Sequence, residues 1–441
     1  MKLQFFAQSS RDPDNWQASS ARLVNCYLEP SQGETGFTIK SDLGTSAFSS
    51  VPGVFFRGMA EVGGVLYAAS GSMLSKIAPD GVATPLGATL DWPDATIAGN
   101  NGNVTLCIAK KYYVWDGAAL SQPAAGAFSD FGSLDYIANY TVLTEADGIR
   151  FQWSSVAAPA TLPGLNFSSA DGKDDKIVRC AAIGGQLYIF KEKSHEIWYP
   201  TGDAGAKAFD RQAGGVVETG LRAFGLFAKI PGSSAFFVGS DGRVHIIGVG
   251  PVSIPPVETA ILTQSPVQCL CWEDEGHVMC AIVFRDCPAW VYDLATGMWH
   301  ERGEDVTLSP WGAASSAKMA GSWFLGRNGG QVLKLSRSNA DFGLPLVRSM
   351  TSLTMESDGK PLRLAELEVF PRIGMGAGAI QMRLSNNNGM TWGQWRQKAW
   401  ALGEYGKQII WKALGTKFRW TVEIRISDPV EVSLNAEGRI K

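Results

Sequence analysis

Four cysteines and one histidine lie close together in the sequence and are the first candidates for metal chemistry. Cys269, Cys271, His277, Cys280 and Cys287 fall within 19 residues. Thiolates and imidazoles bind zinc, but structural zinc sites usually combine two tight ligand pairs, and this spacing fits no familiar knuckle. Cys269 and Cys271 lie two residues apart and therefore share one face of an expected strand, where buried cysteine commonly fills the core. We therefore predict no metal and no other cofactor, and zinc remains the alternative.

Other reactive side chains form no recognisable catalytic motif. No Gly-x-Ser-x-Gly nucleophile motif, P-loop or Gly-x-Gly-x-x-Gly helix start is present. The carboxylates of residues 273–275 fall in an expected turn and are interpreted as a solvated loop. The four histidines are scattered over separate expected hairpins: His195, His245, His277 and His300. The sequence therefore predicts a protein that is not an enzyme.

One turn motif resembles the Asp-box of sialidases and other propellers, Ser-x-Asp-x-Gly-x-Thr-Trp. Its positions are occupied by Ser385, Asn387, Gly389, Thr391 and Trp392, with Asn387 in place of the aspartate. In such a turn the short polar side chain binds the following backbone and the tryptophan packs underneath. We expect it to stabilise a hairpin and to do no chemistry. A sialidase would need several copies, an arginine cluster and a Tyr–Glu pair.

The composition favours a folded, mostly β protein. Charged residues make up 18% and hydrophobic residues 45% of the 441 residues, with 50 Gly and 15 Trp. Many glycines allow many tight turns, and aromatic residues favour strands. The seven cysteines are an odd number and are interpreted as free thiols made in a cytosol. No apolar run is long enough to cross a membrane, and we expect no membrane insertion.

Charge is unevenly divided along the chain. The net charge is −3, whereas proteins that coat DNA are usually basic. Residues 341–441 hold 14 Lys and Arg against 10 Asp and Glu, a net of +4, which leaves −7 for the remainder. The two parts are therefore expected to have different neighbours.

A repeated hairpin dominates the middle of the chain. Two short β runs joined by a Gly, Asp or Asn turn recur seven times, about every 35–50 residues. Examples are residues 236–247, which turn at Asp241-Gly242, and residues 323–335, which turn at Asn328-Gly329. This pattern predicts a β-propeller of about six blades, with seven as the second count and one or two β-sandwiches as the alternative fold. The best candidate for a helix is Pro256–Leu262.

Changes in sequence texture divide the chain into three parts. Residues 1–50 are expected to be an extended N-terminal segment that contributes to assembly or closes the propeller. Residues 51–340 would be the propeller. From residue 341 the strands lengthen and alternate cleanly between polar and apolar residues, which predicts an antiparallel β-sandwich over 341–441.

Several segments, in their order, resemble the packaged-DNA stabilisation proteins, or tail hub and nozzle proteins, of short-tailed bacteriophages. The resemblance covers most of residues 20–340, and residues 341–441 depart from it. The segments that carry it are VNCYLE at 24–29, VPGV at 51–54, RGM at 57–59, GLRAFG at 220–225, VHIIGVGPVS at 244–253 and VETAIL at 257–262.

This resemblance implies a ring, with six copies as the expected number, below the portal and head–tail adaptor of a virion. The ring would prolong the DNA channel, retain packaged DNA and let it pass at ejection, without sequence-specific binding. Tail spike, fibre or needle proteins would be further partners, and the protein would be made in the bacterial host cytoplasm. The alternative is a monomeric propeller that binds a receptor or carbohydrate, and a sialidase-like glycosidase is third.

Overall fold

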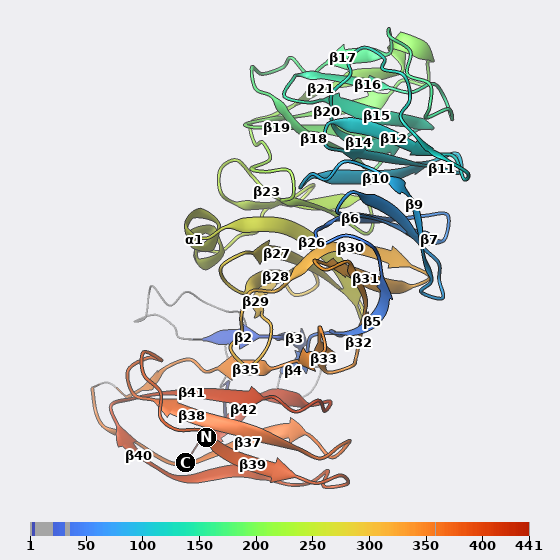
Figure 1. The fold of residues 1–441 in the computed structure, drawn as a ribbon. Helices are drawn as coiled ribbons and strands as arrows, with labels where there is room; N and C mark the ends of the chain where they lie inside the picture. Colours follow the sequence, from blue (N-terminus) through green and yellow to red (C-terminus); the bar gives the residue numbers. More distant parts are fainter. Residues whose placement is uncertain (1, 5–20, 31–35, 358, 441) are drawn as a thin grey trace.

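The computed structural model describes residues 2–4, 21–30, 36–357 and 359–440, and nearly all of their regular structure is β. Figure 1 shows an upper body of small sheets and a lower body of two longer sheets. The helix α1 (Pro255–Thr263) covers the predicted segment with Pro at its start, which removes no needed hydrogen bond there. No helix within these ranges has the length and apolar character needed to cross a membrane.

The upper body is a β-propeller, as predicted, and the described residues supply seven four-stranded antiparallel blades. The first three blades are β6 (Phe56–Val62), β7 (Val65–Ser70), β8 (Met73–Ile77), β9 (Ala83–Ala88); β10 (Ala95–Asn100), β11 (Asn103–Ile108), β12 (Lys111–Trp115), β13 (Leu120–Ser121); and β14 (Phe131–Ile137), β15 (Tyr140–Glu145), β16 (Arg150–Trp153), β17 (Phe167–Ser169). The next three are β18 (Ile177–Ile183), β19 (Gln186–Lys191), β20 (His195–Pro200), β21 (Phe209–Val217); β22 (Phe227–Ile230), β23 (Ser234–Val238), β24 (Val244–Ile246), β25 (Gly250–Pro251); and β26 (Pro266–Asp274), β27 (His277–Phe284), β28 (Ala289–Asp293), β29 (Met298–Arg302).

The seventh blade joins the two ends of the propeller. It consists of β30 (Ala313–Met319), β31 (Ser322–Arg327), β32 (Gln331–Ser336) and, on its outer edge, β5 (Gly44–Ser50) from the N-terminal segment. The first strand β30 also contacts β6, which closes the circle of blades. Gly330 has φ +70° at this point, and an added Cβ would lie 2.0 Å from the Val51 oxygen. Only glycine therefore fits this turn.

The lower body is the expected antiparallel sandwich, and the N-terminal segment adds strands to it. One sheet contains β3 (Cys26–Pro30), β4 (Phe37–Ser41), β42 (Ser433–Ile440), β37 (Leu362–Arg372) and β40 (Ile409–Lys417). The other contains β35 (Arg348–Thr351), β41 (Arg419–Ile426), β38 (Gly378–Ser385) and β39 (Arg396–Trp400). Apolar side chains from both sheets, such as Leu367, Ile380 and Ile424, form its core.

The two bodies share one continuous sheet. Strand β2 (Arg22–Val24) lies between β29 of the sixth blade and β35 of the sandwich. In the sandwich sheet that contains β42, β1 (Lys2–Gln4) pairs with β42, so the two ends of the chain meet in the lower body (Figure 1). Short pieces complete the fold: the 3-10 turn Gly205–Lys207 and the strands β33 (Ala340–Asp341), β34 (Leu344–Pro345) and β36 (Met355–Glu356).

Candidate functional site: the central cavity of the propeller

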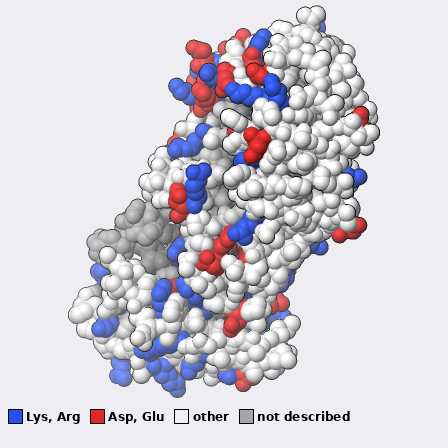
Figure 2. Space-filling model, viewed as in Figure 1, with Lys and Arg blue, Asp and Glu red and all other residues white. Residues whose placement is uncertain are grey.

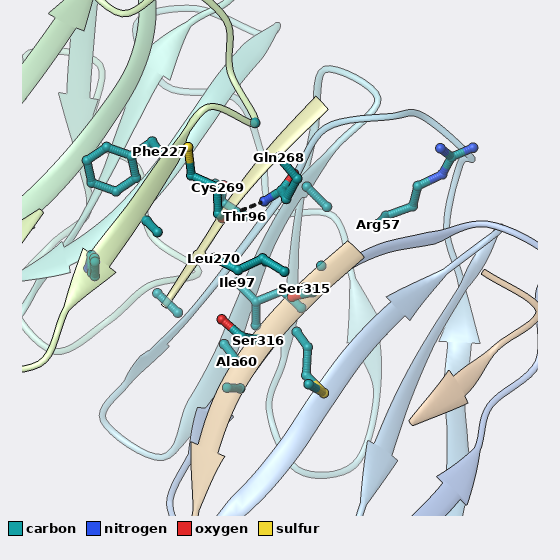
Figure 3. A pocket seen from close by; sticks show the side chains of 18 of the residues that line it. Arg57, Ala60, Thr96, Ile97, Phe227, Gln268, Cys269, Leu270, Ser315 and Ser316 are labelled. Atoms are coloured by element: carbon teal, nitrogen blue, oxygen red, sulfur yellow. Dashed lines mark hydrogen bonds between the residues drawn. The ribbon is translucent and has the colours of Figure 1, made fainter. Parts of the chain in front are cut away.

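The first strands of all seven blades line a central cavity of about 490 Å³. Figure 3 shows side chains from several blades around this space, among them Ile97, Leu270 and Ser316. A volume of this size suits a small molecule. One turn of a DNA duplex is about 34 Å long, so a cavity of about 490 Å³ is far too small to hold it.

Three of the four cations on the cavity wall are paired with a carboxylate. Arg57 lies 2.8 Å from Asp91, and Lys229 lies 2.5 Å from Asp135. Lys318 pairs with Glu273, and this hydrogen bond lowers the pKa of the Glu273 carboxyl. These pairs neutralise much of the charge around the cavity.

The fourth cation, Arg179 on β18, has an aromatic environment instead. Its guanidinium carbon lies 5.0 Å from the Phe224 ring centroid and 4.7 Å from that of Phe227. Its Nη1 donates to the Phe224 carbonyl at 3.3 Å, while its Nε is buried without a hydrogen bond. Burial lowers the pKa of Arg179. Burial also raises the pKa of Asp94, which lines the same cavity.

The histidines lie outside this cavity and contact carbonyls or carboxylates. His195 Nδ1 faces the Thr219 carbonyl at 2.7 Å, and burial lowers its pKa. His245 Nε2 lies 3.0 Å from Asp241, and His300 Nε2 lies 3.2 Å from Asp42. His277 lies between Asp293 and Glu29, at 2.8 and 3.0 Å. In the described part of the chain, these contacts pair no imidazole with a nucleophilic hydroxyl or thiol.

The cysteines considered for zinc lie within the sixth blade or beside it. Cys269, Cys271 and Cys280 are buried free thiols, and Cys287 is half-buried. Cys271 and Cys280 face each other across β26 and β27, with their sulfurs 3.0 Å apart. Burial raises the pKa values of Cys269 and Cys280 well above the usual range, which favours the neutral thiols. Among the described residues, no three His, Cys, Asp or Glu side chains are grouped to hold a metal.

The Asp-box-like residues lie at the end of β38 in the lower body, away from the cavity. The Ser385 hydroxyl accepts hydrogen bonds from the backbone amides of Asn387 and Gly389, at 3.2 and 2.9 Å. The side-chain oxygen of Asn387 accepts a hydrogen bond from the Thr391 amide at 2.9 Å, and its Nδ2 donates one to the Thr391 hydroxyl at 2.8 Å. Trp392 is half-buried, and the Arg383 guanidinium lies 4.8 Å from its ring centroid. These contacts hold a turn.

Sequence reasoning missed two features of these regions. One is a stack in which Arg383 lies between Trp392 and Trp395, and Arg425 covers Trp395 at 4.8 Å. The other is Arg179 itself. A signal for Arg179 existed, because it is the one charged residue in the apolar strand IVRCAAI.

Comparison with known proteins identifies a family. The family model described as "Bacteriophage P22 Gp10, beta-propeller" matches residues 12–261, more than half of the chain. None of the curated proteins is similar enough in sequence to match.

Solved structures resemble the propeller only loosely. The Pan2 WD40 domain of Neurospora crassa has a TM-score of 0.46 and 10% identity, covering 67% of this chain and 95% of that one. The WD40 propeller domain of Doa1 has a TM-score of 0.43 and 8% identity, covering 66% and 97%. The computationally designed Ika8 protein has a TM-score of 0.43 and 13% identity, covering 66% and 99%.

Proposed function

The chain belongs to the phage stabilisation family of bacteriophage P22 Gp10, a β-propeller family, and from this premise we propose that it is a structural, non-enzymatic subunit of the phage tail hub that stabilises packaged DNA. The match over residues 12–261 carries this proposal. The subunit would act as a ring of copies, six being the expected number, that prolongs the portal channel. It would be made in the host cytoplasm and reside in the virion.

The small axial cavity of the propeller supports a ring. The central cavity of about 490 Å³ is too small to hold a DNA duplex, so any DNA channel must lie between subunits. The sheet shared by the sixth blade and the sandwich would let each subunit act as a rigid wall element. Such walls could retain DNA without moving parts.

The charge distribution favours passage of DNA over gripping it. The first 340 residues carry a net charge of −7, which would attract few phosphates if they line the channel. Figure 2 shows Lys and Arg gathered over the lower body, which is the basic part of the chain. We propose that this part faces the adaptor or a tail spike, fibre or needle protein. A basic lumen in the assembled ring would contradict this arrangement.

The test is the mass of the protein in solution, measured by light scattering, followed by negative-stain imaging with and without the head–tail adaptor. We expect either a species of six times the 47.4 kDa chain mass or a monomer that becomes a ring on the adaptor. A chain that stays monomeric with the adaptor and binds glycans would favour the receptor-binding alternative.

Charge reversal tests which end meets the neighbours. The variant Lys398→Glu/Lys417→Glu changes two exposed residues of the sandwich and should weaken adaptor or fibre binding. Lys110→Glu/Lys176→Glu, which reverses two exposed lysines of the propeller, is the matched control and should bind as the wild type does. Equal weakening by both variants would contradict the orientation.

A further inference from the structure

Arg179 differs from every other cation on the wall of the central cavity. Arg57, Lys229 and Lys318 each contact a carboxylate. Among the described residues no carboxylate forms an ion pair with Arg179, although Asp94 and Asp135 are close enough to influence its charge. The cavity therefore holds one cation without an anion of its own.

The nearest carboxylates are poorly placed to supply that anion. Asp135 already binds Lys229 and accepts hydrogen bonds from the Ala182 and Tyr136 amides, both at 2.8 Å. Asp94 lines the same cavity, but it forms no ion pair with Arg179.

The aromatic rings position the guanidinium but do not satisfy it. Phe224 and Phe227 contact its faces, and such contacts contribute about 0.5–2 kcal/mol. Nε lacks a hydrogen bond but is itself buried, so it does not face the cavity. Nη1 binds the Phe224 carbonyl, and among the described residues Nη2 has no acceptor. A planar fork with free donors is the group that proteins use to bind carboxylate and phosphate.

We propose that the central cavity binds a small anion, an organic carboxylate or a phosphate, on the Arg179 guanidinium. The cavity of about 490 Å³ accommodates a ligand of that size, and hydroxyls such as Ser316 lie on its wall (Figure 3). The bound anion would neutralise Arg179 and brace the blades from inside. This proposal does not depend on the tail-hub function, because a monomer would bind the anion equally well.

The experiment measures binding of inorganic phosphate and of citrate to the full chain by calorimetry, with chloride at matched ionic strength as the reference. We expect saturable binding of at least one of the two anions, with one site per chain, and at least tenfold weaker binding by Arg179→Gln. Arg179→Lys should bind more weakly than the wild type but better than Arg179→Gln, because an ammonium lacks the planar fork. Arg150→Gln removes a propeller cation that also contacts an aromatic ring and a carboxylate but lies outside the cavity, and it should bind as the wild type does.

A second variant keeps the test informative if Arg179→Gln fails to fold. Ser316→Phe leaves the guanidinium in place and fills part of the cavity, so it should also abolish binding. The proposal is overturned if the wild type binds neither anion above the chloride reference. It is also overturned if Arg179→Gln, or Ser316→Phe when Arg179→Gln cannot be studied, binds as tightly as the wild type.

Discussion

The N-terminal segment makes two joins in this molecule, and different interactions hold them. The ring closure is the pairing of β5 with β32, which completes the seventh blade. The junction is the region around β2, between β29 of the propeller and β35 of the sandwich, together with nearby side chains of β3, of β29 and of the turn between β4 and β5. Main-chain pairing and apolar packing dominate the first, and buried polar side chains dominate the second.

The ring closure resembles an ordinary strand pair. The register runs from Gly44 opposite Ser336 to Ser50 opposite Gln331, and β5 contains no charged residue. The Phe48 ring lies 4.5 Å from that of Phe324 and packs on the apolar cluster of the first and seventh blades. Such a join should be insensitive to pH and salt.

The junction has little main-chain pairing with the propeller. Its parallel contact with β29 has a single registered pair, Val24 opposite Glu301. Arg22 compensates by donating to both Glu301 carboxylate oxygens, at 2.6 to 2.9 Å. Nearby, Arg302 is fully buried, contacts Asp341 at 3.0 Å and donates to the Leu43 carbonyl at 2.7 Å. Asp341 also accepts a hydrogen bond from Thr45 of β5 at 2.9 Å, so this pair adjoins the ring closure as well. The propeller is therefore closed mainly by strand pairing and apolar packing, whereas charged side chains supplement the sparse main-chain pairing between β2 and the sixth blade.

The largest effect is expected from breaking the buried pair at Arg302. Arg302→Met should destabilise the protein by about 3–5 kcal/mol, because it leaves Asp341 charged and buried. The measurement is urea unfolding followed by tryptophan fluorescence. The double variant Arg302→Met/Asp341→Leu is the control and should recover much of the loss. A loss below about 1 kcal/mol would contradict the importance of buried charge here.

Asn25 should have the next largest effect. This fully buried residue has φ +57°, and its side chain donates to the carbonyls of Gly303 and Val347 at 2.9 and 2.7 Å. Asn25→Ala should cost about 3 kcal/mol, since it orphans buried backbone groups and strains the left-handed backbone. Asn25→Gly should cost about 1 kcal/mol less because glycine removes only the strain. Equal losses would show that the conformation at residue 25 contributes nothing.

Sequence reasoning found the middle of each blade more readily than its edges. The predicted hairpins coincide with second and third strands, such as β23 with β24 and β31 with β32. Middle strands such as β7 are buried almost throughout, so their residues are apolar and easily recognised. Outer strands such as β9 are largely exposed, and inner strands such as β10 carry small residues toward the cavity. The hydrophobic pattern of the outer and inner strands is therefore weak, and the sequence predicts these strands less readily.

The junction and the cavity site were harder to predict for another reason. Asn25 belongs to a segment that resembles the phage family, but its partners lie 278 and 322 residues away. No local pattern reveals such contacts. Arg179 was visible as a charge in an apolar strand, yet its lack of a carboxylate depends on the arrangement of all seven blades.

The ring closure should respond more mildly to a single substitution. Phe48→Ala should lower the free energy of unfolding by about 1–2 kcal/mol, because the phenyl ring of Phe48 is only partly buried and the main-chain pairing of β5 remains. The cost should be the same at low and high salt, whereas charge variants at the junction should show salt dependence. Urea midpoints at two salt concentrations measure this, with Phe324→Leu as the matched variant on β31. A strong salt dependence for Phe48→Ala would remove the distinction between the two joins.

The smallest expected effect is a pH dependence confined to the junction. Burial lowers the pKa of His277, but Asp293 on β28 and Glu29 on β3 outweigh it and raise that pKa above its usual value, while Lys40 pairs with Glu29 alongside. The stabilisation from this imidazolium is therefore complete below about pH 6.5 and is lost as pH rises through the folded-state pKa.

The advantage of the wild type over His277→Gln in urea midpoint should accordingly shrink between pH 6 and pH 9. His195→Gln is the opposite control: burial lowers the pKa of His195, so the wild type loses stability relative to that variant as pH falls below about 6.5. The urea midpoint of Phe48→Ala should change with pH in the same way as that of the wild type, because the ring closure that this substitution perturbs contains no such imidazolium. Parallel curves for the wild type and His277→Gln would mean that the charge on His277 does not hold the N-terminal segment to the sixth blade.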